Sequence, residues 1–182
     1  DKSELEIDGD DNIIAVVTSE VHGGEVTLGM TRGVSIRPKQ KLHYKLTVPD
    51  LNAVTIEGLG NVTVGVLETQ DLKLTVSGSG NIEVAELQAD SLKVQISGLG
   101  SITAAGQTDE LDINISGSGK FSGTDLQAQE ANVRVSGLGN ASVRVQDTLS
   151  VVVSGSGNVT YYGDPKVSEK IDGVGKVTKG GD

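Results

Sequence analysis

Seven Gly-x-Gly tripeptides recur along the chain at nearly constant spacing. Successive tripeptides are separated by 20, 20, 19, 20, 18 and 18 residues. Their first glycines are Gly58, Gly78, Gly98, Gly117, Gly137, Gly155 and Gly173. A fixed period of this size is typical of repeat proteins, in which each copy of one supersecondary unit covers the exposed face of the next. The spacing therefore predicts a solenoid-like fold.

Short runs of alternating apolar and polar residues flank every glycine pair. The positions two and four residues before the first glycine are mostly Ile, Val or Leu, as in Leu74 and Val76. The alternation resumes after the glycines, as in Ile82 and Val84. Alternation with period two predicts strands that are buried on one face. We expect two strands in each repeat, joined at the Gly-x-Gly corner and followed by a polar connection such as Glu68–Asp71.

Glycine is expected at these corners because a sharp bend between strands takes backbone angles that a β-carbon penalises. No segment shows a sustained apolar spacing of three to four residues with caps, which would indicate a helix. We therefore expect almost no helix.

Two architectures could use this unit. In an array of hairpins, neighbouring strands run antiparallel and turns such as Asn-Gly dominate. In a parallel β-helix, equivalent residues of successive coils stack about 4.8 Å apart and are expected to be alike. The residue before the glycine pair is serine in five successive repeats (Ser77, Ser97, Ser116, Ser136 and Ser154). We predict an all-β, right-handed parallel β-helix with coils of 18 to 20 residues, the hand following the usual preference of parallel crossovers.

The residue between the paired glycines alternates between large and small. In chain order it is Leu59, Ser79, Leu99, Ser118, Leu138, Ser156 and Val174. Two interpretations are open: large and small residues alternate within one stack, or successive units face different directions.

The ends of the chain differ from its middle. Residues 1–45 contain no Gly-x-Gly tripeptide. Strand-like stretches in and just after this part lie at 13–17, 25–28, 34–37 and 43–48. We expect this part to be an N-terminal β section or cap, because a solenoid has to cover its exposed end. Residues 46–182 hold the seven repeats, and the last of them places Glu169 and Lys179 at inward positions. We predict one domain over 1–182.

Charge and composition exclude several classes of function. The net charge is −10, and no cluster of Lys or Arg interrupts it, so nucleic acid and anionic membrane surfaces are poor partners. The chain has no cysteine, which excludes disulfides, thiolate zinc sites and cysteine nucleophiles. No apolar run approaches the length of a membrane span. The opening Asp1-Lys2-Ser3-Glu4 looks like the start of a trimmed product, so we expect an export or lipidation signal in the full gene.

Candidate reactive residues are few. His22 and His43 are the only histidines, and we expect them at the surface rather than in a metal site, which needs three or four convergent ligands. A glycosidase or lyase needs paired acids. The aspartates that could serve fall mainly in connections and are not expected to form a stacked column: Asp10, Asp11, Asp50, Asp71, Asp90, Asp109, Asp112 and Asp125. No cofactor or metal is predicted.

Two polar groups could bind a ligand or serve the fold. An asparagine column follows the corners, with substitutions in some repeats: Asn61, Asn81, Ser101, Lys120, Asn140, Asn158 and Lys176. We favour a structural role for it, bridging successive coils by amide stacking. Tyr161 and Tyr162, with Tyr44 elsewhere, could stack on a sugar or pack the end of the rod.

Several segments resemble the family called "putative auto-transporter adhesin, head GIN domain", which is common in Bacteroidetes. The similar segments are Leu46–Leu51 leading into Gly58–Val62, Gly78–Ile82, Gly137–Asn140, Gly155–Val159, Tyr162–Pro165 and Gly173–Lys176. The resemblance covers about residues 40–180, and the part before it is shorter than the family leads us to expect. It implies an exported cell-envelope protein and brings no catalytic residues with it.

These observations favour a non-enzymatic envelope protein that presents polar columns to a glycan or protein partner. Two alternatives stay open: a polysaccharide-active lyase or glycosidase, and a purely structural spacer or assembly module.

Overall fold

The structure is a computed structural model that describes residues 3–31, 33 and 42–181. The chain forms two compact units, residues 1–50 and 51–182. A single domain over 1–182 stays a prediction.

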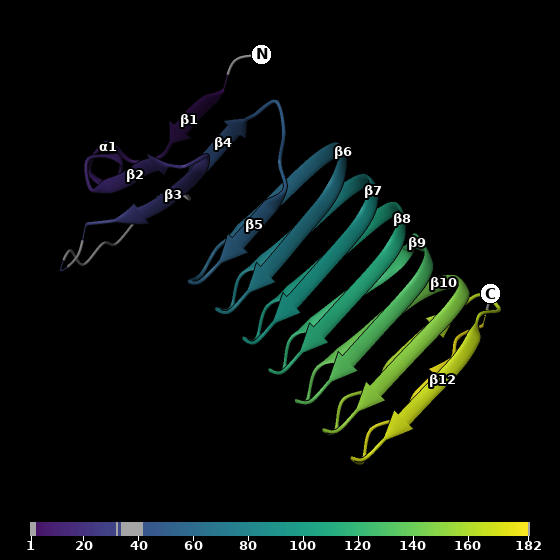
Figure 1. The fold of residues 1–182 in the computed structure, drawn as a ribbon. Helices are drawn as coiled ribbons and strands as arrows, with labels where there is room; N and C mark the ends of the chain where they lie inside the picture. Colours follow the sequence, from purple (N-terminus) through teal and green to yellow (C-terminus); the bar gives the residue numbers. More distant parts are fainter. Residues whose placement is uncertain (1–2, 32, 34–41, 182) are drawn as a thin grey trace. The chain divides into compact units, whose positions relative to one another are not determined.

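The first unit contains two antiparallel strand pairs and a short helix (Figure 1). β1 (Glu4–Asp8) pairs with β4 (His43–Thr47), and β2 (Val17–His22) pairs with β3 (Glu25–Met30). Gly23 and Gly24 form the turn of the second pair with φ of 59° and 86°. A two-residue hairpin turn with two positive φ angles is the type that suits the twist of the flanking strands.

One strand prediction in this unit is wrong. Within 13–17, the first residues belong to α1 (Asp11–Ile14), and strand β2 starts only at Val17. The carbonyl of Asp10 accepts hydrogen bonds from the amides of Ile13 (2.8 Å) and Ile14 (2.9 Å), which closes a helical turn and buries Ile13. The predicted strands 25–28 and 43–48 are confirmed as β3 and β4, while 34–37 lies outside the described residues.

The second unit is a parallel β-solenoid of about six turns. Every strand pair in it is parallel, which confirms the β-helix and excludes the array of hairpins. Its right-handed sense stays a prediction. The strands are β5 (Ala53–Ile56), β6 (Asn61–Val76), β7 (Asn81–Ile96), β8 (Ser101–Ile115), β9 (Lys120–Val135), β10 (Asn140–Val153), β11 (Val159–Tyr162), β12 (Lys166–Ile171) and β13 (Val177–Lys179).

The predicted polar connection is not a loop. The segment Glu68–Asp71 lies inside β6, which runs unbroken for 16 residues and curves round the edge of the solenoid opposite the glycines (Figure 1). Each coil therefore has a leading arm after its Gly-x-Gly corner and a closing arm before the next one. The strand assignment continues through the bend because the ladder persists there, as Glu68 stays in register with Gln88.

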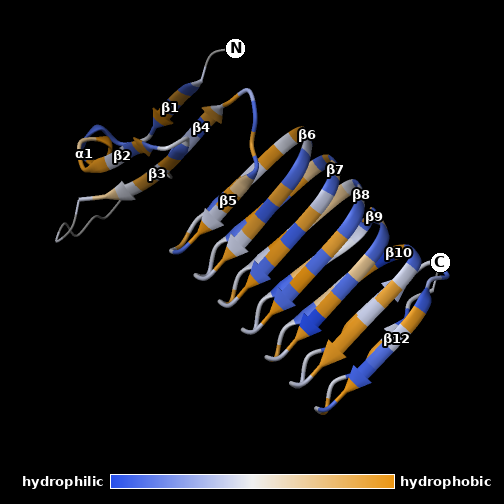
Figure 2. Ribbon diagram, in the orientation of Figure 1, coloured by the Kyte–Doolittle hydropathy of each residue, from blue (hydrophilic) through white to orange (hydrophobic). Residues whose placement is uncertain are grey.

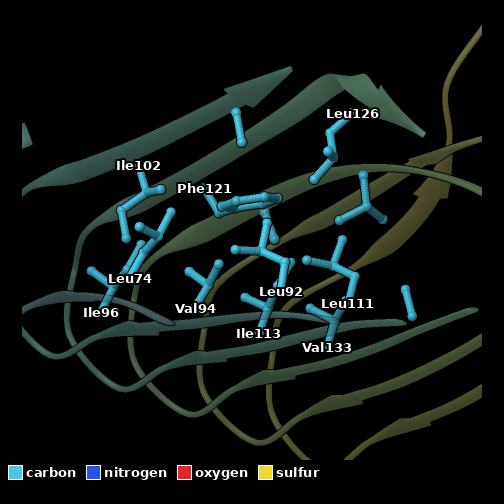
Figure 3. Packing of buried hydrophobic residues seen from close by; sticks show 14 of the residues in the cluster. Leu74, Leu92, Val94, Ile96, Ile102, Leu111, Ile113, Phe121, Leu126 and Val133 are labelled. Atoms are coloured by element: carbon cyan, nitrogen blue, oxygen red, sulfur yellow. The ribbon is translucent and has the colours of Figure 1, made fainter. Parts of the chain in front are cut away.

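The core lies between the leading and closing arms. Hydrophobic and hydrophilic residues alternate along both arms (Figure 2), and the apolar ones point inward (Figure 3). In one coil the buried side chains are Ile82, Val84, Leu87, Ala89, Leu92, Val94 and Ile96. Register is kept from coil to coil, so Leu72, Leu92 and Leu111 form one interior column. Such columns of branched side chains fill a thin core with little need for aromatic residues.

Corner glycines are required for a reason other than the predicted one. Only Gly60 among them has a positive φ, so strained backbone angles do not explain the pattern. A Cβ atom on Gly98 would lie 1.8 Å from the carbonyl oxygen of Gly78, and one on Gly100 would lie 1.8 Å from that of Gly80. Glycine is needed because each corner stacks directly on the backbone of the corner before it.

All corners belong to a single column, which decides between the two interpretations of the Leu/Ser alternation. The amide of Leu99 donates a 3.0 Å hydrogen bond to the carbonyl of Gly78. Equivalent bonds of 3.0 to 3.1 Å are made by the amides of Ser79, Ser118, Leu138, Ser156 and Val174. Large and small residues therefore alternate along one stack.

The final coil is more polar than the others. Glu169 of β12 is in register with buried Val151, yet it is exposed, as is the whole of β12. Lys179 pairs with Asp164, and this contact holds the pKa of the Asp164 carboxyl below its usual value. Charged residues on a final strand discourage pairing with another chain, as expected for an end coil.

Candidate functional site

A polar groove runs along the edge of the solenoid opposite the glycine corners. It has a volume of about 740 Å³ and crosses the bends of β6, β7, β8 and β9. We call it the polar edge groove. Its lining residues are Glu68, Thr69, Gln70, Gln88, Ala89, Asp90, Gln107, Thr108, Asp109, Gln127 and Gln129.

Register places these residues in columns along the solenoid axis. Glu68, Gln88, Gln107 and Gln127 are paired in successive coils and form one column. All four side chains belong to exposed residues. Stacked strands repeat about every 4.8 Å, so the groove offers one amide or carboxylate at each such step.

A second column borders the first. Asp90 and Asp109 lie between the register pairs Ala89–Thr108 and Ser91–Glu110 and therefore share one position in adjacent coils. The same position holds Gln70 and Gln129 in the flanking coils, so two of the eight aspartates form a stacked pair and the others do not extend it. The cause is that the bend belongs to continuous strands, whose ladder keeps polar residues aligned.

Thr108 forms part of the groove floor and is buried. Its hydroxyl lies 3.1 Å from the carbonyl of Glu110 and 3.4 Å from that of Asp90 in the preceding coil. A hydroxyl has one proton to donate, so it serves one of these acceptors at a time. Thr69 lies likewise 3.4 Å from the carbonyl of Asp71. These contacts hold the threonine side chains against the backbone of the bend. The side-chain amides of the glutamine column point outward from it.

The groove is acidic. Three of its lining residues carry carboxylates, Glu68, Asp90 and Asp109, and none of the described lining residues is basic. Arg144 is in register with Gln127 and is not among the lining residues, and its Nε donates a 2.8 Å hydrogen bond to the carbonyl of Thr124. Such a surface repels anionic ligands and suits neutral or cationic ones.

Differences in coil length fall near the same edge. Between β7 and β8 the register shifts between Val84 and Leu87, and Gly106 with φ of 113° takes up the change. Between β9 and β10 it shifts again beyond Val143 and Val145. The corners keep strict stacking, so this edge is the part of the coil that accommodates variation in sequence length.

A smaller hollow of about 310 Å³ lies on the closing arms of the last coils. Its lining includes Glu130 and Lys166, which carry opposite charges. It crosses β9, β10 and β12, and thus fewer coils than the polar edge groove.

The histidines lie where the sequence predicts them. His22 ends β2 and lies 3.8 Å from Glu20, while His43 begins β4, and both are exposed. Among the residues that the structure describes, no three His, Cys, Asp or Glu side chains gather closely enough to hold a metal ion.

The remaining aspartates of the sequence analysis are scattered. Asp10 and Asp11 begin the helical turn of the first unit, and Asp50 ends that unit. Asp112 lies 3.6 Å from Arg134 on the outer face of the closing arms. Asp71 and Asp125 lie within β6 and β9.

The asparagine column bridges coils, as predicted. Nδ2 of Asn81 donates a 2.9 Å hydrogen bond to Oδ1 of Asn61, and the amide of Ser101 donates one of 3.1 Å to Oδ1 of Asn81. Asn158 makes the same contact to Asn140 at 3.1 Å. These amides are consumed by the ladder, which supports their structural role.

The two tyrosines pack the last coils. The ring of Tyr162 lies 5.5 Å from the guanidinium of Arg144, within the range of a cation–π contact. A Cβ on Gly180 would lie 2.3 Å from Tyr162, so this backbone packs directly on the ring. Tyr161 packs against the hydrophobic core. Packing at the end of the solenoid therefore explains both residues better than sugar stacking.

Residues 1–165 match the family described as "putative auto-transporter adhesin, head GIN domain", and the chain belongs to this family. The match includes the N-terminal unit, so the expected start of the resemblance near residue 40 is wrong. Its end at residue 165 leaves the last corner outside the matched region.

The helix α1 has four residues, and no described helix is long and apolar enough to cross a bilayer.

Solved structures of similar proteins share the fold. A putative adhesin from Bacteroides fragilis is 27% identical with a TM-score of 0.91, over 98% of this chain and 83% of that one. A putative adhesin from Parabacteroides distasonis is 29% identical with a TM-score of 0.74, over 98% and 84%. A putative lipid binding protein from the same organism is 23% identical with a TM-score of 0.69, over 100% and 85%, and shows the fold alone. Comparison with curated proteins gives no match.

Proposed function

We propose that this chain is a non-enzymatic binding module of the bacterial cell envelope that holds an extended neutral glycan in the polar edge groove. The observation that carries the proposal is the column of Glu68, Gln88, Gln107 and Gln127, which presents one hydrogen-bonding side chain per coil. The family's description as an adhesin and the adhesin names of its structural relatives support a binding role at the surface or envelope.

The chemistry of the groove matches sugar hydroxyls. A glutamine amide both donates and accepts hydrogen bonds, as a hydroxyl does, and a carboxylate accepts them through both of its oxygens. The acidic lining disfavours uronic acids and sulfated sugars. Apart from Ala89, the lining is polar, so affinity per sugar is expected to be low. A longer glycan is expected to bind more tightly because it crosses more coils.

The direct experiment measures binding of the full chain to an array of neutral and anionic glycans, followed by calorimetry with the best neutral polymer. Gln88→Ala combined with Gln107→Ala should weaken binding about tenfold or more, since each lost hydrogen bond contributes about 0.5–1.5 kcal/mol. Gln95→Ala is the matched control because Gln95 lies on the closing arm between buried Val94 and Ile96, away from the groove. Equal losses in both variants, or binding only to anionic glycans or basic proteins, would contradict the proposal.

A polysaccharide-active enzyme is the second candidate because Asp90 and Asp109 share one position in adjacent coils. A glycosidase needs its two carboxyl groups on either side of the scissile bond. Both aspartates lie exposed on one edge among hydrogen-bonding side chains, so binding is favoured over cleavage. Release of shorter products from a bound glycan, abolished by Asp90→Asn, would reverse this order.

A further inference from the structure

The corner column carries exposed apolar side chains at every second coil. Leu59, Leu99, Leu138 and Val174 are 88%, 71%, 64% and 80% exposed, although each lies in a turn that is hydrogen-bonded to a neighbouring corner. We call this row the corner ridge. The polar edge groove is lined by residues of the bends in β6 to β9 and by no corner residue, so the ridge plays no part in the proposed glycan site.

Serines separate these large residues. Ser79, Ser118 and Ser156 occupy the same position in the intervening coils. We call the large residues knobs and the positions of the serines gaps. With coils about 4.8 Å apart, the knobs repeat about every 10 Å, and each gap is the width of one coil. A surface of evenly spaced knobs and gaps is complementary to a copy of itself displaced by one coil.

Charge is distributed in a way that permits such contact. The chain contains 25 acidic residues. None of them lies in the five middle corners, residues 77–81, 97–101, 116–120, 136–140 and 154–158, while Glu57 begins the first corner and Asp172 begins the last. Lys120 is the one charged residue in the five middle corners. Two copies with a net charge of −10 can therefore approach along this edge with less repulsion than elsewhere.

We propose that the corner ridge is a docking surface for a second copy of this chain, arranged antiparallel about a two-fold axis. In a two-fold interface, residue i of one copy contacts residue j of the other, and j contacts i. The register that uses all three leucines places Leu59 opposite Ser156 of the partner subunit, Leu99 opposite Ser118 of the partner subunit, and Leu138 opposite Ser79 of the partner subunit. Each leucine then meets a serine, and Val174 lies beyond the paired corners.

The ridge is narrow, so the dimer is weak. Stable interfaces bury about 1,200–2,000 Å² in total. One row of turns presents less than that, which points to a reversible dimer seen at high protein concentration. The serines and asparagines that flank the corners form its polar rim.

The test is sedimentation equilibrium of the full chain over roughly 10 µM to 1 mM. Replacing the knobs (Leu59→Ser, Leu99→Ser and Leu138→Ser together) should raise the dissociation constant about tenfold or more, because apolar burial is lost. Filling the gaps (Ser79→Leu, Ser118→Leu and Ser156→Leu together) should raise it as well, because knobs then meet knobs. Both residue types already occur at this position of the coil, so the fold accommodates either set. Val66→Ser is the control, since Val66 is 86% exposed but lies outside the ridge.

The two variants separate self-docking from general stickiness. If the variant with filled gaps forms tighter dimers, the ridge is merely apolar and the proposal fails. Binding of that variant to phosphatidylcholine vesicles, alongside the tighter dimers, would identify the cause as general stickiness. A wild-type chain that stays monomeric at the highest concentration also overturns it.

Cross-linking tests the orientation. The chain has no cysteine, so single cysteines report on one position. A mixture of Leu59→Cys and Ser156→Cys chains should form disulfide-linked dimers far faster than either variant alone. A parallel pair displaced by one coil would instead link Leu59→Cys to Ser79→Cys, and that result would contradict the antiparallel arrangement.

Discussion

The ring of Phe121 occupies the space that a side chain at Gly123 would need. A Cβ atom on Gly123 would lie 2.7 Å from Cε1 of Phe121. Gly123 is in register with Val143 of the next coil, at a position that is apolar and larger in most other coils. The single phenylalanine of the chain thus fits the core only because its own coil leaves a neighbouring position empty.

This pair should show strong energetic coupling. Gly123→Val should lower the free energy of unfolding by about 1–3 kcal/mol, because it overpacks the core beside the ring. In a Phe121→Val background the same change should cost less, since the coil then resembles that of Ile82 and Val84. Chemical denaturation of the two single variants and the double variant gives the coupling energy. Additive effects would mean that the two positions do not share space.

The corner glycines offer a matched pair of substitutions. Gly98→Ala should destabilise the chain by about 1–3 kcal/mol or more, because its Cβ would meet the carbonyl oxygen of Gly78. Gly58→Ala should be neutral or slightly stabilising, since a Cβ on Gly58 meets nothing within 4 Å. Thermal and urea unfolding of both variants checks the expectation. Equal destabilisation by the two substitutions would mean that backbone angles, and not contact between coils, explain the need for glycine at the corners.

A buried charge should disrupt the stack of coils. Ile96 is 1% exposed, and Ile96→Asp should cost about 3–5 kcal/mol because the carboxylate has no partner in the core. Asn114→Asp is the control, as Asn114 is exposed on a closing arm and in register with Arg134. It should change the unfolding free energy by less than about 0.5 kcal/mol. An unchanged melting temperature for Ile96→Asp would show that its column is not interior.

Much of this fold could be predicted from residue patterns. The period of the glycine doublets predicts the coil, and the alternation around Leu74 and Ile96 predicts which side chains are buried. The reason for the glycines could not be predicted, because the approach of Gly98 to Gly78 is a contact between coils 20 residues apart and leaves no signal within one repeat. The strand predicted over 13–17 is wrong because a stretch of five residues is too short for its apolar pattern to distinguish a helical turn from a strand.

The candidate site was harder to predict. Its glutamines Gln88, Gln107 and Gln127 do recur at intervals of 19 and 20 residues, and this column is visible in the sequence once the coils are aligned. The polar composition of the bend predicts an irregular connection, in which register carries no meaning, and this hides the column. The hairpin at Gly23 and Gly24 had a signal as well, a glycine pair between two alternating runs.

The Asp164–Lys179 contact predicts a local pH dependence. Lys179 lowers the pKa of Asp164 below its ordinary value of 3.8, first through a hydrogen bond and then through charge. Because the folded pKa lies below the unfolded one, the pair stabilises the fold above pH 3.8 and loses its effect as the pH falls through the folded pKa. The effect is small, since Asp164 is exposed. A carboxyl titration by NMR should show the low pKa, and Lys179→Ala should return it to about 3.8; an unchanged value would contradict the assignment.

Deletion of one coil separates a binding face from a spacer. Removing residues 79–98 joins Gly78 to Leu99 and keeps a Gly-x-Gly corner while it removes Gln88 and Asp90 from the groove. The shortened chain should fold cooperatively and bind glycan more weakly, by about tenfold or more. Deletion of residues 138–155, which leaves the described groove residues in place, is the control. Equal glycan binding by both would favour the spacer.

The central claim is that each glycine doublet adds one coil in register to the stack. Spin labels on cysteines introduced at Ser77 and at Ser116, Ser136 or Ser154 test it by pulsed electron resonance, since all four residues are exposed just before their corners. The pairs span two, three and four coils. We predict distances that grow by about 4.8 Å per coil, to about 19 Å for Ser77–Ser154. Distances that do not increase in order along the chain would contradict the stacked-coil fold.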